Sequence, residues 1–319
     1  MIASTYRAPR WLPGGHVQTI YPLLIKGTTP AYERERWDTP DGDFIDLDWV
    51  PGPATAPLVV LFHGLEGSSS SHYARALMRS VIARSWRGVV VHFRGCSGEP
   101  NRLPRAYHSG DADEIDWVLK RLKSHNPHTS VYAVGVSLGG NALLKWAGTR
   151  SRACLGITER IAAISAPLDV AIAGRTMSRR ENRLYQNNFL ATMKPVAAEK
   201  HRRFPGLFDA ARVAAATTLE EFDDAFTAPV HGFKDVHDFW RQVSSKPDLK
   251  QIRVESLVMN ARNDPFLPHT ALPKAHEVSA TVRLEQPEEG GHVGFAVGPF
   301  PGNIDWLPER VLRFFSSGQ

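Results

Sequence analysis

The chain of 319 residues is 42% hydrophobic and 22% charged, a composition that is typical of folded globular proteins and excludes disordered, collagen-like and coiled-coil chains. Its length suits one large domain with an insertion, or two modest domains. The net charge of +5 comes from 38 basic and 33 acidic residues, and the basic residues are spread along the chain. The densest basic clusters, at 179–180 and 200–203, are interpreted as solvated helix faces rather than phosphate contacts, so no nucleic-acid partner is expected.

Two cysteines, Cys96 and Cys154, are too few for a disulfide framework or a thiolate metal site, so reduced thiols in a cytoplasmic protein are expected. The N-terminal residues lack an apolar stretch followed by a cleavage site, so no secretory signal is predicted. Apolar stretches are interrupted before they reach about 18 residues, so no transmembrane segment is predicted either. No group of His, Cys, Asp or Glu has the spacing of metal ligands, and no metal or other cofactor is expected.

The first part of the chain is expected to form an arm and a hairpin. Residues 1–30 are rich in proline, glycine and aromatic residues without clear periodicity, which indicates a packed arm. The runs 33–38 and 43–50 flank the turn signal Pro40-Asp41-Gly42. Partial alternation of apolar and polar residues in the second run predicts an antiparallel β-hairpin.

The chain then alternates between two kinds of apolar pattern. Continuous apolar runs predict strands that are covered on both faces, at 58–62, 88–93, 130–136, 161–165, 254–260 and, more weakly, 281–285. Apolar residues at helical spacing predict helices at 72–85, 110–124 and 138–149. Alternating strands and helices form right-handed βαβ units, so the predicted fold class is α/β, with a mostly parallel central sheet flanked by helices.

The alternation stops between residues 168 and 246. This stretch contains helical segments, many charges and several aromatic residues, among them Phe226 and Phe233, but no strand-like run. We therefore predict a helical cap inserted above the sheet, whose aromatic residues line an apolar acyl pocket rather than form a membrane-docking face. The expected organisation is an N-terminal arm and the first part of the core at 1–167, the cap at 168–246 and the rest of the core at 247–319.

A Gly-x-Ser-x-Gly motif at 135–139 directly follows one predicted strand and directly precedes a predicted helix. A sharp turn between strand and helix forces its central residue into a strained backbone conformation, so small residues are needed on both sides. The turn lifts the hydroxyl of Ser137 above the sheet, and the helix N-terminus favours negative charge there. The motif therefore predicts an α/β-hydrolase fold with Ser137 as the nucleophile.

A serine hydroxyl needs a base within hydrogen-bond reach, and in the α/β-hydrolase fold an acid and then a histidine follow the serine along the chain. Asp264 follows a late predicted strand and is predicted to be the acid, because the amide of neighbouring Asn263 cannot stabilise an imidazolium. His292 follows the last predicted strand in a glycine-rich loop and is predicted to be the general base. His269 and His276 come before that strand, within an expected helix, and are less suitable.

Two backbone N–H groups are needed to stabilise a developing oxyanion. One is expected from Leu138, directly after the nucleophile, and the other from Leu65, in the glycine-rich loop after the first predicted parallel strand. His63, at the start of that loop, is expected to brace it rather than to transfer protons. Cys96 could also be read as a nucleophile, but the sequence places no separate base and acid for it. It is expected to shape the pocket floor.

With these motifs placed, the chain resembles the YheT-like branch of α/β hydrolases, which is related to eukaryotic abhydrolase-domain esterases and lipases. The resemblance covers nearly the whole chain and is carried by the segments at 11–19, 63–67, 94–101, 107–110, 135–141 and 221–224 and by those around Asp264 and His292. The family pattern often has two aspartates at the acid loop, where this chain has Asn263 and then Asp264. The resemblance implies carboxylesterase-type activity without a cofactor.

The sequence does not decide between three possible functions. The first is hydrolysis of a small-molecule carboxylic ester with an apolar acyl or alcohol group, through an acyl-enzyme on Ser137 with His292 and Asp264. The second is the same chemistry on a thioester, an amide or a phospholipid. The third is a catalytically silent binding protein, because fold alone does not decide function. The oligomeric state also stays open.

Overall fold

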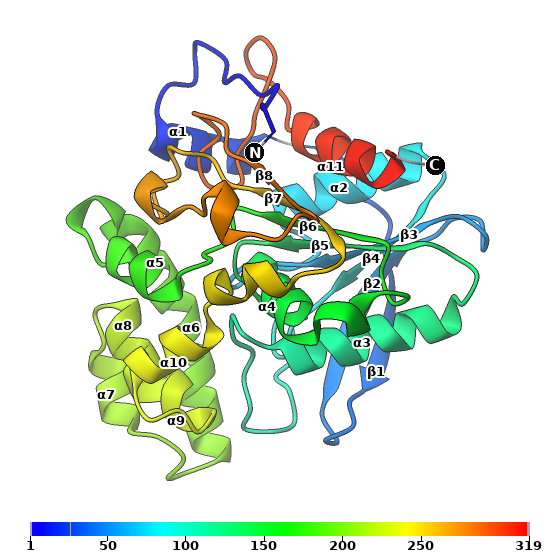
Figure 1. Cartoon of the computed structure of the whole chain (residues 1–319). Coiled ribbons are helices and arrows are strands. Elements are labelled where there is room, and N and C mark those ends of the chain that lie inside the picture. The colour runs from blue at the N-terminus through cyan, green and yellow to red at the C-terminus, as the bar shows by residue number, and fades with distance from the viewer. Residues whose placement is uncertain (1, 26, 318–319) are drawn as a thin grey trace.

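The computed structural model describes residues 2–25 and 27–317, and its centre is one eight-stranded sheet (Figure 1). The strand order is β1-β2-β4-β3-β5-β6-β7-β8. The strands span Glu33–Asp38 (β1), Phe44–Val50 (β2), Leu58–Phe62 (β3), Arg87–Val91 (β4), Val131–Val136 (β5), Arg160–Ile164 (β6), Glu255–Met259 (β7) and Val282–Glu285 (β8). β2 pairs antiparallel with β1 and β4, whereas every other neighbouring pair is parallel. The predicted hairpin and mostly parallel sheet are confirmed.

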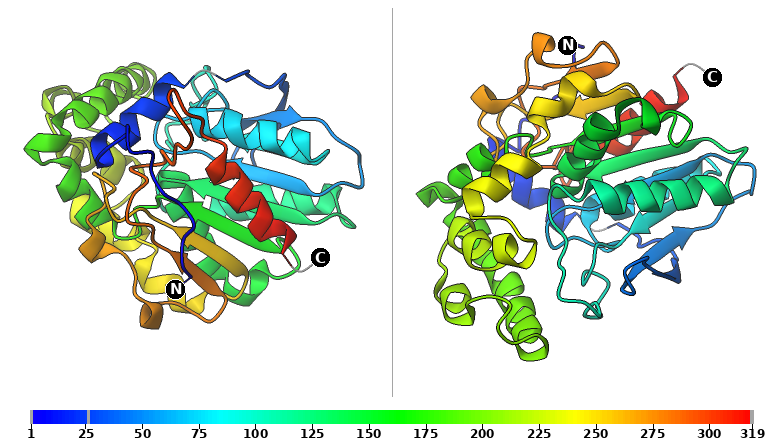
Figure 2. Two further views of the ribbon diagram at one scale, coloured as in Figure 1. Left: turned by 90° about the horizontal axis from the view of Figure 1, so that it is seen from above. Right: turned by 60° about the horizontal axis from the view of Figure 1, so that its bottom comes forward.

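Helices cover both faces of this sheet, as the views in Figure 2 show. Two helices lie on each face: α3 (Ala112–His125) and α4 (Leu138–Arg150) on one, α2 (His72–Ala83) and α11 (Trp306–Ser316) on the other. Along β3, Val60 and Phe62 pack with α3 and α4, while Val59 and Leu61 pack with α2 and α11. Successive side chains of a strand point to opposite faces, which explains why a central strand such as β3 is apolar throughout.

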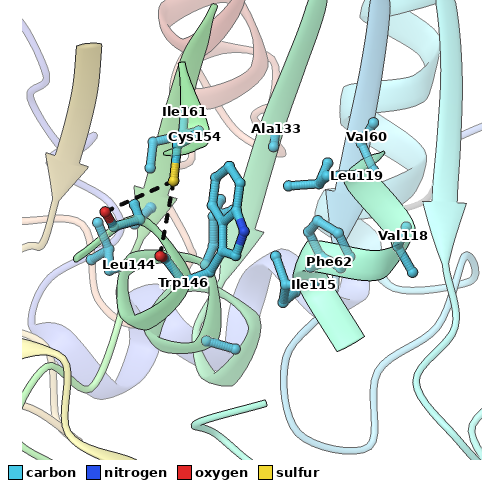
Figure 3. Packing of buried hydrophobic residues seen from close by; sticks show 14 of the residues in the cluster. Val60, Phe62, Ile115, Val118, Leu119, Ala133, Leu144, Trp146, Cys154 and Ile161 are labelled. Carbon is cyan, nitrogen blue, oxygen red and sulfur yellow. Dashed lines mark hydrogen bonds between the residues drawn. The ribbon is translucent and has the colours of Figure 1, made fainter. Parts of the chain in front are cut away.

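The core between the sheet and the helices α3 and α4 is packed around Trp146 (Figure 3). The indole is fully buried, and its Nε1 donates a hydrogen bond to Asp116 at 2.9 Å. Cys154 is buried beside it, with Sγ 3.9 Å from the backbone oxygens of Trp146 and Ala147. Cys154 is therefore a packing residue, because a thiol buried in apolar surroundings is chemically inert.

The segment between β6 and β7 is helical, and the described chain forms no strand there. Its helices are α5 (Val170–Met177), α6 (Arg183–Arg203), α7 (Ala210–Ala215), α8 (Leu219–Phe222), α9 (Ala228–Val230) and α10 (Val236–Val243). They gather on one side of the sheet (Figure 1) and bury two apolar clusters whose buried residues all belong to this segment. The predicted helical insertion is confirmed, while its division from the core at 168 and 246 stays a prediction.

The basic cluster at 200–203 is not wholly a solvated face, so that expectation is wrong for Lys200. Lys200 on α6 is only 4% exposed, and its ammonium donates hydrogen bonds to Asn101 Oδ1 at 2.7 Å and to the backbone oxygens of Leu103 and Arg105. Burial lowers the pKa of Lys200 to about 8. These acceptors come from the loop after β4, far earlier in the chain, so the charge pattern of α6 does not reveal them.

The prediction of a helix around His269 and His276 is also wrong. The chain forms two short 3₁₀ turns there instead, His269–Ala271 and Ala275–Glu277. Pro268 and Pro273 precede these turns, and a proline both lacks the N–H of a helical hydrogen bond and clashes with the preceding turn. The two prolines therefore prevent a continuous helix.

Truncation of the core between α3 and the sheet is expected to destabilise the protein strongly. Leu119 on α3 is fully buried, so Leu119→Ala should lower the free energy of unfolding by about 2–5 kcal/mol. Leu155 is 52% exposed, and Leu155→Ala should change it by less than about 0.5 kcal/mol. Urea denaturation followed by circular dichroism measures both, and equal losses would contradict the assignment of Leu119 to the core.

Candidate active site

The turn between β5 and α4 places Ser137 at the carboxyl end of the sheet. Ser137 has φ 52° and ψ −118°, a left-handed conformation that residues with a side chain rarely adopt. A Cβ atom on Gly135 would lie 2.4 Å from the backbone oxygen of Gly139, and one on Gly139 would lie 2.4 Å from the backbone oxygen of Phe62. Both distances are too short for any side chain, so the two glycines of the motif are required by packing.

The structure brings Ser137, His292 and Asp264 together in one hydrogen-bonded row. Ser137 Oγ lies 2.9 Å from His292 Nε2, and His292 Nδ1 lies 2.7 Å from Asp264 Oδ2. A carboxylate can only accept, so Nδ1 carries the ring proton and Nε2 is free to accept the serine proton. The Asp264 carboxylate is completely buried, and its Oδ1 accepts a hydrogen bond from the backbone N–H of Phe266 at 2.8 Å.

The loop that carries His292 is held by the N-terminal arm through helix α1 (Gly15–Ile20). Gln18 Oε1 accepts hydrogen bonds from the Gly290 N–H at 2.9 Å and from Asn263 Nδ2 at 2.8 Å. Asn263 Oδ1 in turn accepts from the Gly291 N–H at 3.0 Å. Asn263, on the acid loop, therefore contacts the arm with one end of its amide and the histidine loop with the other. An aspartate could not donate the hydrogen bond to Gln18.

Sequence reasoning missed Gln18 and Thr19. The backbone N–H of His292 donates to Thr19 Oγ1 at 2.9 Å, and Gln18 is fully buried. The segment at 11–19 was part of the family resemblance, which was the available signal for these residues. The residues of this segment match no known catalytic motif, so only the folded arm reveals that the segment positions the histidine.

Two tyrosine hydroxyls leave the backbone N–H of Leu65 as the free donor in its loop. The Gly64 N–H donates to Tyr73 Oη at 2.9 Å, and the Glu66 N–H donates to Tyr107 Oη at 2.8 Å. Among the residues that the structure describes, the N–H of Leu65 has no hydrogen-bond partner. A Cβ on Gly64 would lie 3.2 Å from Cβ of Ser137, so this loop runs directly beside the serine.

At the start of α4, a backbone N–H is likewise left free between two N–H groups that are hydrogen-bonded. The Ser137 N–H donates to the backbone oxygen of Ile164 at 2.8 Å, and the Gly139 N–H donates to that of His63 at 3.1 Å. Between them, the N–H of Leu138 has no partner in the described part of the chain. The two N–H groups predicted from the sequence, those of Leu65 and Leu138, are therefore both free beside Ser137.

His63 fixes the peptide that carries the Leu65 N–H. Its Nδ1 donates to the backbone oxygen of Gly64 at 2.7 Å, and its Nε2 accepts from the Phe93 N–H at 3.1 Å. Burial lowers the pKa of His63 to about 3, so the ring stays neutral in one tautomer. Because a peptide is planar, fixing the oxygen of Gly64 also fixes the direction of the Leu65 N–H. This arrangement supports a bracing role.

A cavity of about 570 Å³ opens beside Ser137 and His292. Its wall on the side of the helical insertion includes six aromatic residues: Tyr185, Phe189, Phe222, Phe226, Phe239 and Trp240. Cys96 also borders it, and burial raises the pKa of its thiol to about 12, so the thiol stays protonated. Phe233 does not border the cavity, contrary to expectation, because it packs behind Phe239 with ring centroids 5.1 Å apart.

The described residues contain no group of three His, Cys, Asp or Glu side chains placed to hold a metal ion. Between residues 2 and 25 and between residues 27 and 317, no helix is long and apolar enough to cross a membrane.

The chain is similar to several known hydrolases. A family model described as alpha/beta hydrolase fold matches residues 57–299. The Escherichia coli protein named "Putative esterase YheT" is 39% identical over 93% of this chain and 88% of the relative. Human phospholipase ABHD3 is 28% identical over 99% of this chain and 79% of the relative. The solved structure of Est1E from Butyrivibrio proteoclasticus with ferulic acid covers 89% of this chain and 97% of that chain, at TM-score 0.57 and 14% identity. These findings confirm the resemblance inferred from the sequence motifs.

The geometry predicts one serine activated by a histidine. A fluorophosphonate should form a single adduct on Ser137, detected by intact-protein mass spectrometry and peptide mapping. His292→Ala should slow labelling by about 100-fold or more, because the base is lost. Ser70 borders the same cavity and is exposed, so Ser70→Ala serves as a control that keeps the labelling rate. Unchanged labelling of Ser137→Ala would refute the prediction.

Proposed function

Because the chain belongs to the alpha/beta hydrolase fold family, we propose that it is a serine hydrolase that cleaves carboxylic esters through an acyl-enzyme. The observation that carries the proposal is the hydrogen-bonded row of Asp264, His292 and Ser137, which borders an apolar-walled cavity. A serine hydroxyl next to a histidine that is itself oriented by a carboxylate is the arrangement that makes serine nucleophilic.

In the proposed mechanism, Ser137 Oγ attacks the carbonyl carbon of the ester while His292 Nε2 takes the serine proton. The N–H groups of Leu65 and Leu138 stabilise the oxyanion of the tetrahedral intermediate. The His292 imidazolium, stabilised by Asp264, then protonates the leaving alcohol as the C–O bond breaks. Water, deprotonated by His292, attacks the acyl-enzyme, releases the acid and restores Ser137.

We assign the substrate to small-molecule esters with an apolar acyl or alcohol part. The six aromatic residues of the cavity wall support this assignment, because apolar and aromatic walls bind apolar groups. One relative is phospholipase ABHD3, which keeps a phospholipid among the candidate substrates. Thioesters and amides fit the same chemistry. We further propose that 168–246 acts as a cap on a core formed by 1–167 and 247–319.

A purely binding role is less well supported. A binding protein needs neither a strained serine at a strand-to-helix turn nor two free N–H groups beside it. Within the residues described, both cysteines are free thiols, which supports our proposal that the protein acts in the cytoplasm.

Removal of the acidic charge tests the assignment of Asp264. Asp264→Asn keeps the shape but removes the charge that holds the His292 tautomer, so kcat for p-nitrophenyl butyrate should fall by up to about 10⁴, as the same change does in serine proteases. Glu288, an exposed carboxylate four residues before His292, provides the control, and Glu288→Gln should retain wild-type kcat. Wild-type turnover by Asp264→Asn would place the acid elsewhere.

The cavity wall predicts a difference between two phenylalanines of the cap. Phe226 borders the cavity, so Phe226→Ala should lower the ratio of kcat/KM for octanoate over acetate esters by roughly tenfold, through lost apolar contact. Phe233 packs behind the wall, so Phe233→Ala should keep this ratio within about twofold. An unchanged ratio in Phe226→Ala would exclude the cap wall from acyl selection.

A further inference from the structure

The carboxyl group of Asp223 borders the same cavity as Ser137. Asp223 belongs to the cap and is the first residue of the π-helical segment Asp223–Thr227, which follows α8. Its Oδ1 accepts a hydrogen bond from Thr227 Oγ1 at 2.7 Å, and its Oδ2 accepts one from Trp240 Nε1 at 2.9 Å. Both donors are neutral, and the proposed hydrolysis at Ser137 makes no use of this group.

Asp223 is half-buried, and its partners differ from those of the fully buried carboxyl groups of the protein. Each Asp or Glu that is buried in the described chain pairs with an arginine or a histidine: Asp43, Asp46, Asp48, Asp111, Glu114, Asp264 and Glu285. Asp223, which is half-buried at the cavity wall, has no such partner among the residues described. Burial raises its pKa to about 6, so it is mostly ionised near pH 7.5. A partly buried charge without a counter-charge is still costly, so a cationic partner from outside the chain would stabilise it.

The cationic side chains that border the cavity do not supply this partner. Arg94 is paired with Asp41 and Glu114, and Lys200 is held by Asn101 and two backbone oxygens. Arg75 borders the cavity as well, but it forms no ion pair with Asp223.

The surroundings of Asp223 suit an organic cation rather than a metal ion. The cap wall of the cavity is aromatic, with Phe222, Phe226 and Phe239 beside Asp223 in the same lining, and aromatic faces attract ammonium groups. A metal ion would need further oxygen or nitrogen ligands, and the described residues offer no such cluster. A π-helical turn at this position is a further indication, because such turns occur frequently at functional sites.

We propose that Asp223 binds a positively charged amine or quaternary ammonium group in the acyl or alcohol part of the substrate. The preferred substrates are then esters in which an apolar portion carries a cationic group. This inference rests on the proposed ester hydrolysis at Ser137 and narrows its substrate class. The carboxylate selects the substrate and takes no part in bond breaking.

The test compares two esters of equal shape and different charge. Butyrylcholine carries a trimethylammonium group, and 3,3-dimethylbutyl butyrate carries a carbon in place of the nitrogen. Wild-type protein should hydrolyse the choline ester with about tenfold or higher kcat/KM. Asp223→Asn, which keeps the size and can still accept a hydrogen bond from Trp240, should lose this preference and keep kcat/KM for the neutral ester within about twofold.

The neighbouring Asp224 provides a matched control. It pairs with Arg212, accepts from the Val236 N–H and lies outside the cavity lining, so Asp224→Asn should keep the preference for the choline ester. Equal kcat/KM of the wild type for the two esters would overturn the proposal. An equal loss for both esters in Asp223→Asn would show that the residue only supports the cap, which would also overturn it.

A binding measurement separates this proposal from the proposed function. In a Ser137→Ala background, butyrylcholine should raise the melting temperature of the protein with Asp223 by a few degrees and should not raise that of Asp223→Asn. If no ester is hydrolysed but this shift occurs, the hydrolase proposal fails and the cation site stands. If the protein hydrolyses esters and a fluorophosphonate labels Ser137, but butyrylcholine does not shift the melting temperature, the proposed cation site is wrong.

Discussion

The left-handed turn at Ser137 is the constraint on which the candidate site depends. The Ser137 N–H is bonded to the end of β6, and the Gly139 N–H is bonded to the residue after β3. The turn therefore joins the carboxyl ends of three neighbouring parallel strands, β3, β5 and β6, where ligands of open α/β sheets bind. Because the glycines let backbone approach backbone, the serine hydroxyl and the N–H groups of Leu65 and Leu138 meet in one small space. Donors that are held in place before the reaction need no reorganisation during it.

The histidine of the site is positioned by a segment at the opposite end of the chain. Helix α1 uses Gln18 and Thr19 to bind backbone N–H groups of the His292 loop, and Asn263 joins that loop to the one that carries Asp264. The arm is thus part of the support of the site. A 1 Å error in the position of such a histidine would disrupt its hydrogen bonds on both sides, so this support has a direct bearing on the proposed proton transfer.

The carboxyl groups of Asp264, behind His292, and of Asp223, at the cavity wall, have different environments and hence different proposed roles. Asp264 has a histidine N–H and a backbone N–H as donors, and it orients the base. Asp223 has only a hydroxyl and an indole as donors, and burial raises its pKa to about 6. Asp264 has its cationic partner within the protein when His292 is protonated, whereas Asp223 has none among the residues that the structure describes. A substrate cation would complete the second site in the way that His292 completes the first.

The local pattern of the sequence determined the α/β class, the order of strands and helices, and the turn at Ser137, because continuous apolar runs and close-packed glycines reflect constraints between near neighbours in the chain. The order of acid and base along the chain also identified Asp264 and His292 as the residues that now lie in a row with Ser137. Only the tertiary structure decided that Lys200 is buried, that Phe226 rather than Phe233 borders the cavity, and that Asp223 meets no counter-ion in the described part of the chain. Each of these depends on which side chains from distant segments meet, and residue type and spacing within one helix carry no information about that contact.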